Sequence, residues 1–222
     1  MVTEQNVVYK SYLLTFIFII LISGCSTTQT ANLSREKEEE ALEYLREGGR
    51  HYDDGKYEKA VDAYKKAAEI MPGNAYAHFN LGASYERLYL YEESLNSYKK
   101  SISIKSDDPL VFYNLGIVYS KMRNYQEAVK AFKQAAELYP DYAEAYYGIG
   151  WAHGESGQYQ QAIDGYNRAI SADPDFTKAH YALGNIYVIN GDSESALKEY
   201  EILLGLDPAR ADDLLKAIKS SQ

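Results

Sequence analysis

Among the residues of this 222-residue chain that could take part in covalent or metal chemistry, the most distinctive are one cysteine and four histidines. Because Cys25 is the only cysteine, a disulfide within one chain is excluded. A zinc site needs several ligands that converge on one point, and the histidines are far apart in the sequence, at His51, His78, His153 and His180. No glycine-rich loop follows a predicted strand, and Ser, His and Asp form no readable triad. We therefore expect a protein that is not an enzyme and that has no metal and no cofactor.

Cys25 follows a segment with the features of an export signal. Residues 12–22 are apolar apart from Thr15, and this run is too short to cross a bilayer, which takes about 20 residues. Its length suits the core of a secretory signal peptide. The motif Ile22–Gly24 then directly precedes the cysteine. This order resembles a bacterial lipobox, which implies that residues 1–24 are a signal peptide and that the thiol of Cys25 takes a diacylglyceryl group.

The lipobox resemblance implies a protein held at a membrane by several acyl chains, since one chain alone binds only marginally. Residues 25–33 then form a lipidated tether. The residue after the cysteine is Ser26 and not an aspartate. In lipoproteins of two-membrane bacteria, this resembles the signal for default sorting to the outer membrane, facing the periplasm. The alternative is that residues 7–24 remain as an uncleaved anchor and that the position of Cys25 is accidental.

The rest of the chain follows a period of 34 residues. Four of the five prolines fall at one phase of this period, and numbering that phase as position 32 divides the chain into five units without a gap. A fixed period of this length indicates a solenoid of stacked helical pairs. The prolines are Pro72, Pro140, Pro174 and Pro208, and the units are residues 41–74, 75–108, 109–142, 143–176 and 177–210.

The columns of the repeat predict how the helices pack. Position 8 is always glycine, although glycine inside a helix costs about 1 kcal/mol relative to alanine, which indicates a close backbone approach. Position 24 is always aromatic and position 20 is always small. We therefore expect large rings to pack into the spaces that small residues leave at a fixed spacing. All four histidines fall in columns 4 and 11, which otherwise hold tyrosine or phenylalanine, so we expect them to be packing residues. The two main columns are Gly48, Gly82, Gly116, Gly150 and Gly184, and Tyr64, Tyr98, Phe132, Tyr166 and Tyr200.

This pattern resembles the tetratricopeptide repeat, with its small residue at position 8, aromatic residues at 11 and 24, alanines at 20 and 27, and proline at 32. The resemblance covers residues 41–210 and implies an all-α fold, a right-handed α-solenoid of five helical hairpins within residues 34–210. Leu203 replaces the small residue of column 27 in the last unit. We expect the packing to change there, against a helix around residues 211–219 in a capping segment, 211–222, that closes the array.

In tetratricopeptide repeat proteins the first helix of each unit lines a concave groove, which positions 2, 5, 9 and 12–13 face. Here position 5 carries an aromatic ring in four units, and Trp151 lies one helical turn from Tyr147. Asparagines at position 6 can bind a peptide backbone in this family. The alternative is that the rings only pack against neighbouring first helices. The predicted partner-binding groove consists of Tyr52, Tyr76, Phe79, Asn80, Tyr113, Asn114, Ile117, Tyr147, Trp151, Tyr181 and Asn185.

The charge pattern narrows the choice of partner. The net charge is −9, and the absence of a basic stripe argues against nucleic acid. No lysine or arginine occupies positions 5 and 9 of neighbouring units, which argues against the carboxylate clamp that holds acidic tails in this family. We therefore expect an extended or helical protein segment with apolar side chains to bind the groove.

The sequence thus predicts a lipid-anchored tetratricopeptide repeat lipoprotein that acts as a protein-interaction scaffold or assembly factor in the bacterial cell envelope. It is similar in layout to the small lipoproteins that serve as pilotins in type IV pilus assembly. Two other functions stay open: an accessory subunit that docks cell-wall enzymes, and a glycan-binding module that stacks sugars on its rings.

Overall fold

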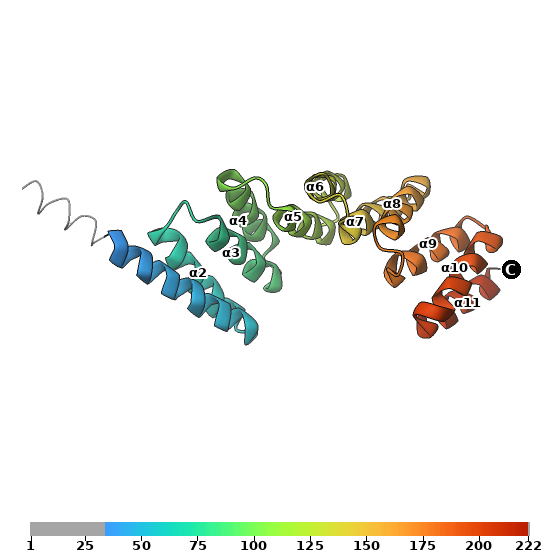
Figure 1. Ribbon diagram of the computed structural model, residues 1–222, viewed down its shortest axis with the longest axis horizontal. Helices are drawn as coiled ribbons and strands as arrows, with labels where there is room; N and C mark the ends of the chain where they lie inside the picture. The colour runs from blue at the N-terminus through green and yellow to red at the C-terminus, as the bar shows by residue number, and fades with distance from the viewer. Residues whose placement is uncertain (1–33, 222) are drawn as a thin grey trace, which may run out of the picture.

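The computed structural model describes residues 34–221, and every regular element within them is a helix. The helices follow one another as antiparallel pairs that form an elongated array, with the two ends of the described chain at opposite ends of it (Figure 1). Cys25 and the predicted signal peptide lie outside the described residues. The prediction of an all-α array of helical hairpins is confirmed.

Each repeat unit contributes one hairpin. A helix over residues 34–53 packs against α2 (Tyr57–Ile70). Four further pairs follow, and α11 (Pro208–Ser220) packs on the last of them. The pairs are α3 (Ala75–Arg87) with α4 (Tyr91–Ile104), α5 (Pro109–Lys121) with α6 (Tyr125–Leu138), α7 (Ala143–Glu155) with α8 (Tyr159–Ala172), and α9 (Thr177–Ile189) with α10 (Ser193–Leu206).

The turn inside each hairpin uses a left-handed residue at position 15. Gly55, Gly157 and Gly191 have φ angles of 73°, 74° and 75°, a region that glycine enters without steric cost. Tyr89 and Arg123 hold the same position in the second and third units with φ angles of 60° and 59°. The same turn is therefore built in all five hairpins, twice with a residue that has to be forced into it by the surrounding packing.

The packing within a hairpin depends on the ring of column 24 lying directly over the glycine of column 8. In each of the first four units, a Cβ placed on that glycine would lie 2.7 Å from a ring carbon, closer than real Cβ atoms approach. No side chain larger than hydrogen fits between the two helices at this level. The four contacts are Gly48 with Tyr64, Gly82 with Tyr98, Gly116 with Phe132, and Gly150 with Tyr166.

The last unit replaces this contact with one from the capping helix. A Cβ on Gly184 would lie 2.5 Å from Cδ2 of Leu214, which belongs to α11. Leu203, Leu214 and Ile218 are fully buried in one cluster, so α11 covers the end of the array as a capping helix does in a solenoid.

The capping helix begins at Pro208, three residues before the start expected at Ala211. The Asp207 side chain caps it by accepting a hydrogen bond from the backbone N–H of Arg210 at 3.2 Å, and a proline fits the first turn because its missing N–H would have no helical partner there. The proline that marks position 32 of the last unit thus starts a helix as well as ending one.

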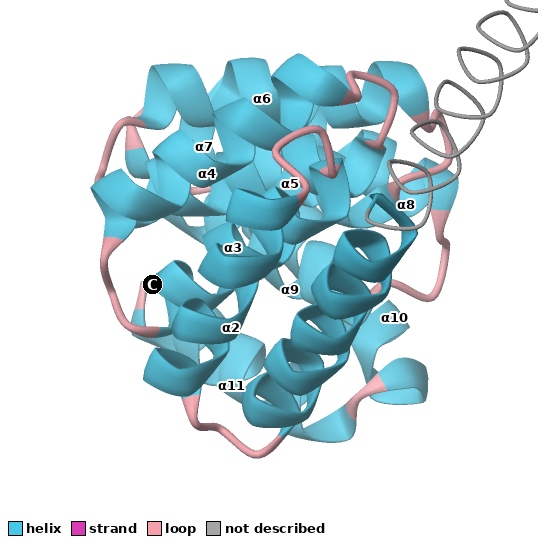
Figure 2. Cartoon of the chain, turned by 90° about the vertical axis from the view of Figure 1, so that its left-hand side faces the viewer, coloured by secondary structure: helices cyan, strands magenta, loops and turns pink. Residues whose placement is uncertain are grey.

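The first helices of successive units contact one another, α3 with α5, α5 with α7 and α7 with α9. The second helices of the described units have no comparably extensive contact with each other. First helices therefore lie on the shorter, inner side of the array, and second helices on its outer side. Figure 2 views the array from its N-terminal end, where α3, α5 and α9 are labelled near the middle of the view and α6, α8 and α10 nearer its edge. We call the surface formed by α3, α5, α7 and α9 the inner face.

Two of the histidines link neighbouring units. His78 and His180 both stand at position 4, and each lies within hydrogen-bond distance of the carbonyl oxygen of a position-32 proline, Pro72 at 3.2 Å and Pro174 at 2.9 Å. His180 is also buried, with Nδ1 2.7 Å from Oε2 of Glu199. These side chains thus pack, as the column pattern predicts, and also fasten each hairpin to the turn before it.

None of the helices in residues 34–221 combines the length and apolar character that crossing a bilayer requires.

Gly165→Ala should destabilise the protein strongly. A Cβ there would lie 2.6 Å from Cα and N of Gly150, which are backbone atoms and cannot move aside as a side chain could. We expect a loss of about 1–3 kcal/mol in the free energy of unfolding, measured by urea denaturation. Gly205→Ala is the matched control, because no atom lies within 4 Å of its Cβ and alanine favours a helix by about 1 kcal/mol. Equal stability of the two variants would contradict the close approach of α7 and α8.

Alkaline pH should unfold the array through its buried tyrosines. Burial is the main cause that raises the pKa of Tyr64 and of Tyr142 to about 12, and it raises the pKa of Tyr98 and of Tyr166 further. A raised pKa means that these tyrosines keep their protons to a higher pH in the folded state than in the unfolded chain. The stability that follows from this difference is therefore fully present below pH 10, the ordinary pKa of tyrosine, and it is lost as the pH rises above that value. Ionisation of the last tyrosines, followed by tyrosinate absorbance, should coincide with the loss of helical circular dichroism, whereas ionisation of every tyrosine with the helices intact would contradict this prediction.

Candidate functional site

An apolar pocket of about 310 Å³ opens on the inner face between α5 and α7. Tyr113 and Ile117 line it from α5, and Tyr147 and Trp151 line it from α7. These four are all predicted groove residues, and positions 5 and 9 of two successive units supply them. The pocket is thus the place where the structure brings members of the predicted set together.

The depth of the pocket depends on one local departure from the repeat pattern. Phe132 of α6 is the one ring of column 24 without a hydroxyl, and Gly148 of α7 stands at position 6, where the two preceding units carry asparagine. A Cβ on Gly148 would lie 2.8 Å from Cζ of Phe132. The end of the ring therefore reaches into the space that a position-6 side chain would fill, and ring and glycine together form the wall behind the four groove residues.

The position-5 rings are held in place by other rings of their own unit. The centroid of Tyr113 lies 5.7 Å from that of Phe132 and 5.1 Å from that of Tyr142. Tyr147 repeats the arrangement one unit later, at 5.6 Å from both Tyr166 and Phe176. Burial raises the pKa of Tyr113 and Tyr147 above the ordinary value. Each ring thus packs on one side and lines the pocket on the other, and a partner-binding role for these rings stays a prediction.

The supporting rings replace helix caps. Asn74 and Asp108 stand at position 34 in the first two units, where their side chains accept a hydrogen bond from the first turn of the next helix at 3.0 Å. Tyr142 and Phe176 hold that position in the next two units and form no such cap. A side-chain cap stabilises a helix by about 1 kcal/mol. The helices α7 and α9 lack this stabilisation, and the same positions carry rings beside the groove instead.

Three polar residues complete the lining, namely Ser120 and Lys121 at the end of α5 and Glu144 in the first turn of α7. Neither Lys121 nor Glu144 forms an ion pair with a residue in the described part of the chain. Glu86 of α3 is a nearby carboxylate whose pKa is raised by burial, although Lys121 and the Tyr98 hydroxyl oppose that rise. The pocket therefore has an apolar interior with one cation and one anion at its rim, neither of them in a close ion pair with a described residue.

The other predicted groove residues lie outside this pocket. Tyr76 is 61% exposed, whereas Phe79 packs on Tyr98 with a centroid separation of 5.8 Å. Tyr52 packs edge-on against Tyr57 at 5.4 Å, and Tyr181 packs against the C-terminal cluster.

The three predicted asparagines differ in how far their side chains are already engaged. Asn80 and Asn185 donate to the carbonyl oxygens of Tyr76 and Tyr181 in their own helices, at 2.8 and 2.9 Å. Asn114 has no side-chain hydrogen bond to any described residue, which leaves its whole amide for a ligand.

Sequence reasoning did not select Ser120, Lys121, Phe132, Glu144 and Gly148 as site residues. For Phe132 and Gly148 a signal was present, since each is the exception in its column. Lys121 and Glu144 stand at positions 13 and 2, which face the groove, but a single charge at such a position is not distinctive. Nothing in the repeat pattern marks Ser120, because its distinguishing feature is a buried hydroxyl that has no hydrogen-bond partner among the described residues.

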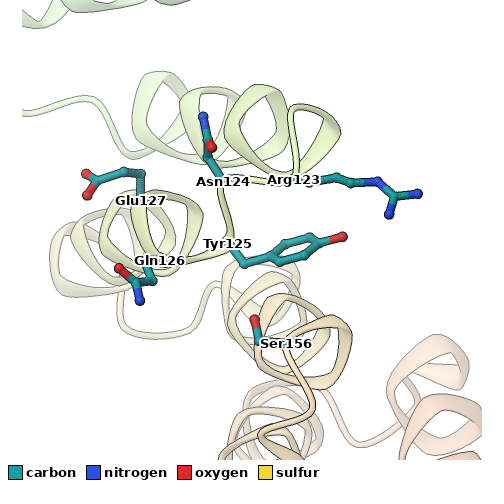
Figure 3. A pocket seen from close by; sticks show the side chains of 6 residues that line it. All are labelled: Arg123, Asn124, Tyr125, Gln126, Glu127 and Ser156. Carbon is teal, nitrogen blue, oxygen red and sulfur yellow. The ribbon is translucent and has the colours of Figure 1, made fainter.

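A second hollow, of about 370 Å³, lies at the turn between α5 and α6 and is lined by residues with polar or charged ends (Figure 3). Arg123 and Glu127 extend to opposite sides of it, away from each other, and the hydroxyl of Ser156 donates to the carbonyl of Ala152 at 2.6 Å. Its polar groups do not converge on a common point. Within residues 34–221, moreover, no three His, Cys, Asp or Glu side chains are placed so that they could hold a metal ion.

Comparison with known families decides what this array is. Models described as tetratricopeptide repeat match residues 107–175 and 149–211, and one described as TPR repeat matches residues 48–88 and 91–122. The chain belongs to the tetratricopeptide repeat family. Its architecture is accordingly the right-handed solenoid of that family, and the repeats indicate a scaffold for interactions between proteins.

Solved structures of repeat proteins share this fold. MamA is 28% identical, with a TM-score of 0.71 over 78% of this chain and 95% of its own. YrrB, described as a TPR protein with an unusual peptide-binding site, is 24% identical, with a TM-score of 0.68 over 84% and 97% of the two chains. PilF of Pseudomonas aeruginosa is 19% identical, with a TM-score of 0.67 over 84% and 90%. A search of the curated proteins finds no match.

Substitutions at Tyr147 should separate its packing role from any role of its hydroxyl. Tyr147→Ala removes the contacts with Tyr166 and Phe176 and should lower the free energy of unfolding by about 2 kcal/mol or more. Tyr147→Phe should change it by less than about 0.5 kcal/mol, since the hydroxyl has no hydrogen-bond partner among the described residues.

Tyr76→Ala serves as the control for both measurements, because Tyr76 is exposed and its ring packs on no ring within residues 34–221. We expect its unfolding curve to match that of the parent within about 0.5 kcal/mol. A Tyr147→Ala protein as stable as Tyr76→Ala would mean that the pocket wall is not held by ring packing.

Proposed function

We propose that this protein is a lipid-anchored scaffold of the bacterial cell envelope that captures a segment of a partner protein on its inner face. The observation that carries the proposal is the pocket between α5 and α7, where four groove residues from two repeat units surround one apolar space. Rigid aromatic side chains are the usual anchors of protein interfaces, because they present a large area at a small cost in conformational entropy.

The chemistry of the inner face favours a protein segment over a sugar. A sugar site needs several hydrogen-bonding side chains beside its rings, whereas only three of the nine lining residues, Ser120, Lys121 and Glu144, are neither aromatic nor apolar. One side of Tyr113 and of Tyr147 is also covered by rings of the protein itself. A segment with an apolar side chain for the pocket and backbone groups for the free amide of Asn114 suits this surface better.

The membrane anchor is proposed from the sequence, since Cys25 lies outside the described residues. A lipobox-like motif precedes Cys25 and a short polar stretch separates it from the helix at residues 34–53. An anchor of this kind would hold the repeats close to the membrane, which suits an assembly factor for a pilus or secretion subunit. The likeness to PilF is compatible with such a role, although at 19% identity it concerns the fold alone.

Cys25→Ala should move the protein from the membrane fraction to the soluble fraction of fractionated cells, because the acyl chains have no other attachment point. Cys25→Ser is a second variant that keeps the size of the side chain and should behave in the same way. Retention of both variants at the membrane would contradict the lipid anchor and favour an uncleaved apolar segment.

Photo-cross-linking in cells should locate the partner. A photoreactive residue at Lys121, on the pocket rim, should capture a partner that the same residue at Lys133, on the second helix α6, does not. Ile117→Lys should abolish this capture by placing a charge in the apolar pocket, whereas Leu138→Lys, at an exposed leucine of α6, should leave it unchanged. Capture that is insensitive to Ile117→Lys would contradict the inner-face proposal.

A further inference from the structure

We infer that the C-terminal end of the array docks one amphipathic helix of a partner protein over α10, beside α11. The inference concerns a surface other than the inner face, and it does not rest on the proposed function. This surface is formed by Leu197, Glu201 and Leu204 of α10, which we call the end strip. Its exposure, the packing of α11 and its charge support the inference.

The end strip is apolar surface of a kind that the repeat buries elsewhere. Leu197 and Leu204 stand at positions 21 and 28 of the last unit, two helical turns apart on one face of α10. They are 39% and 45% exposed, whereas position 28 is buried or half-buried in all four preceding units. Exposed apolar surface of this kind marks an interaction site. The buried residues at position 21 are Val61, Leu95 and Val129, at 6, 5 and 8% exposure.

Inside the array, one face of a helix covers position 21. At each of the four boundaries between units, position 21 packs in the same cluster as position 7 of the next first helix. Positions 3 and 10 of that helix are buried as well, so its covering face is apolar or small at the spacing i, i+4 and i+7. The three residues are Val111, Leu115 and Val118 in α5, and Ala179, Leu183 and Ile186 in α9.

The helix α11 lies beside α10 at the C-terminal end of the array (Figure 1) but does not present such a face. If residue 211 is counted as position 1 of a sixth unit, positions 3, 7 and 10 are Asp213, Ala217 and Ser220. The buried face of α11 instead carries Leu214, which packs on Gly184 of α9. The two leucines of the end strip are not members of the cluster that α11 forms with α9 and α10. The last helix therefore covers part of this end and leaves the end strip open.

The charge of the end strip indicates what accompanies the apolar face of the partner helix. Glu201 is exposed at position 25, between the two leucines, where the first three units carry lysine. Two of these lysines, Lys65 and Lys99, each place Nζ 5.6 Å from the ring centroid of a tyrosine in the next first helix. Position 25 thus contacts the helix that covers the strip. Because the nearby Lys198 is paired with Glu194 at 2.8 Å, we expect a lysine or arginine of the partner helix to pair with Glu201.

The same chemistry argues against a second copy of this chain as the occupant. Two end strips paired about a twofold axis would bring Glu201 of both copies together, and like charges repel. Head-to-tail stacking would place the end strip on the helix at residues 34–53, whose positions 3, 7 and 10 are Glu43, Glu47 and Arg50. Burying those charges against leucine is unfavourable. The N-terminal end thus has the polar outer surface that the end of a solenoid needs, and the end strip does not.

The test is a selection of phage-displayed helical peptides, randomised on one face, for binding to the purified full-length protein in lipid nanodiscs. Binders to empty nanodiscs are removed first. Enriched helices should carry apolar residues at i, i+4 and i+7 with a lysine or arginine beside them. Leu197→Lys should weaken the binding of a selected helix by about tenfold or more, because it places a charge in the apolar contact.

Two further variants control this measurement. Leu204→Lys, at the more exposed leucine, should cause the same loss of binding with an unchanged melting curve by circular dichroism. Leu138→Lys is the matched control, since Leu138 is 42% exposed on α6 and lies outside the end strip. It should leave the affinity unchanged.

Charge exchange tests the role of Glu201. Glu201→Lys should weaken the binding of a selected helix about two- to fivefold, as expected for an exposed ion pair. Replacing the base of that helix by glutamate should restore binding to the Glu201→Lys protein. A helix with glutamine in place of the base is the control and should bind the parent and the Glu201→Lys protein equally.

The outcomes separate this inference from the proposed function. Selected helices that bind the Leu197→Lys and Leu204→Lys proteins as tightly as the parent, or a selection that enriches no helix, would overturn the inference. A parent protein that sediments as a dimer and becomes monomeric with Leu197→Lys would also overturn it, because a second copy would then cover the end strip. Helices that lose binding only with Ile117→Lys would support the inner-face site and overturn the end strip, whereas Leu197→Lys should leave photo-capture at Lys121 unchanged.

Discussion

The array depends on a ring packed directly on a glycine. In each of the first four hairpins the column-24 ring occupies the space beside the column-8 glycine, with no room for even a methyl group. This contact sets how closely the two helices of a hairpin approach, and the approach in turn fixes how the next hairpin stacks. Glycine is unfavourable within a helix, so its recurrence at one position shows that the packing gained exceeds that cost. At the C-terminal end, Leu214 of α11 takes the place of the ring, which is how the repeat is brought to a close.

The candidate site arises where this regular packing is altered at one unit boundary. Phe132 lacks the hydroxyl that the other rings of its column carry, and Gly148 lacks the side chain that position 6 otherwise has. Together they let a ring reach across from α6 to α7 and leave a hollow on the inner face. Tyr142 and Phe176 support the groove rings in place of helix caps, so local helix stability is exchanged for a rigid aromatic wall. A repeat fold can thus acquire a binding site through a few substitutions while every hairpin keeps its shape.

Most of the fold could be predicted from the sequence, because the 34-residue period determines the positions of glycines, rings and prolines together. The start of the last helix could not be predicted in the same way. Asp207 and Pro208 end the last repeat unit, and they also form the N-terminal cap and the first residue of α11. The site was predictable in part: helical spacing placed Tyr113, Ile117, Tyr147 and Trp151 on one face. The unmet hydroxyl of Ser120 and the contact of Phe132 with Gly148 depend on distances between helices, which a column pattern does not contain.

The most direct measurement of the central claim uses Trp151, the only tryptophan in the chain, as a reporter inside the pocket. Its fluorescence can be quenched by iodide in water before and after saturation with the partner segment captured at the pocket rim. If a partner side chain fills the pocket, bound protein should show a clearly reduced quenching constant and a shifted emission maximum. Unchanged quenching and emission at saturation would show that the partner binds elsewhere and would contradict the account.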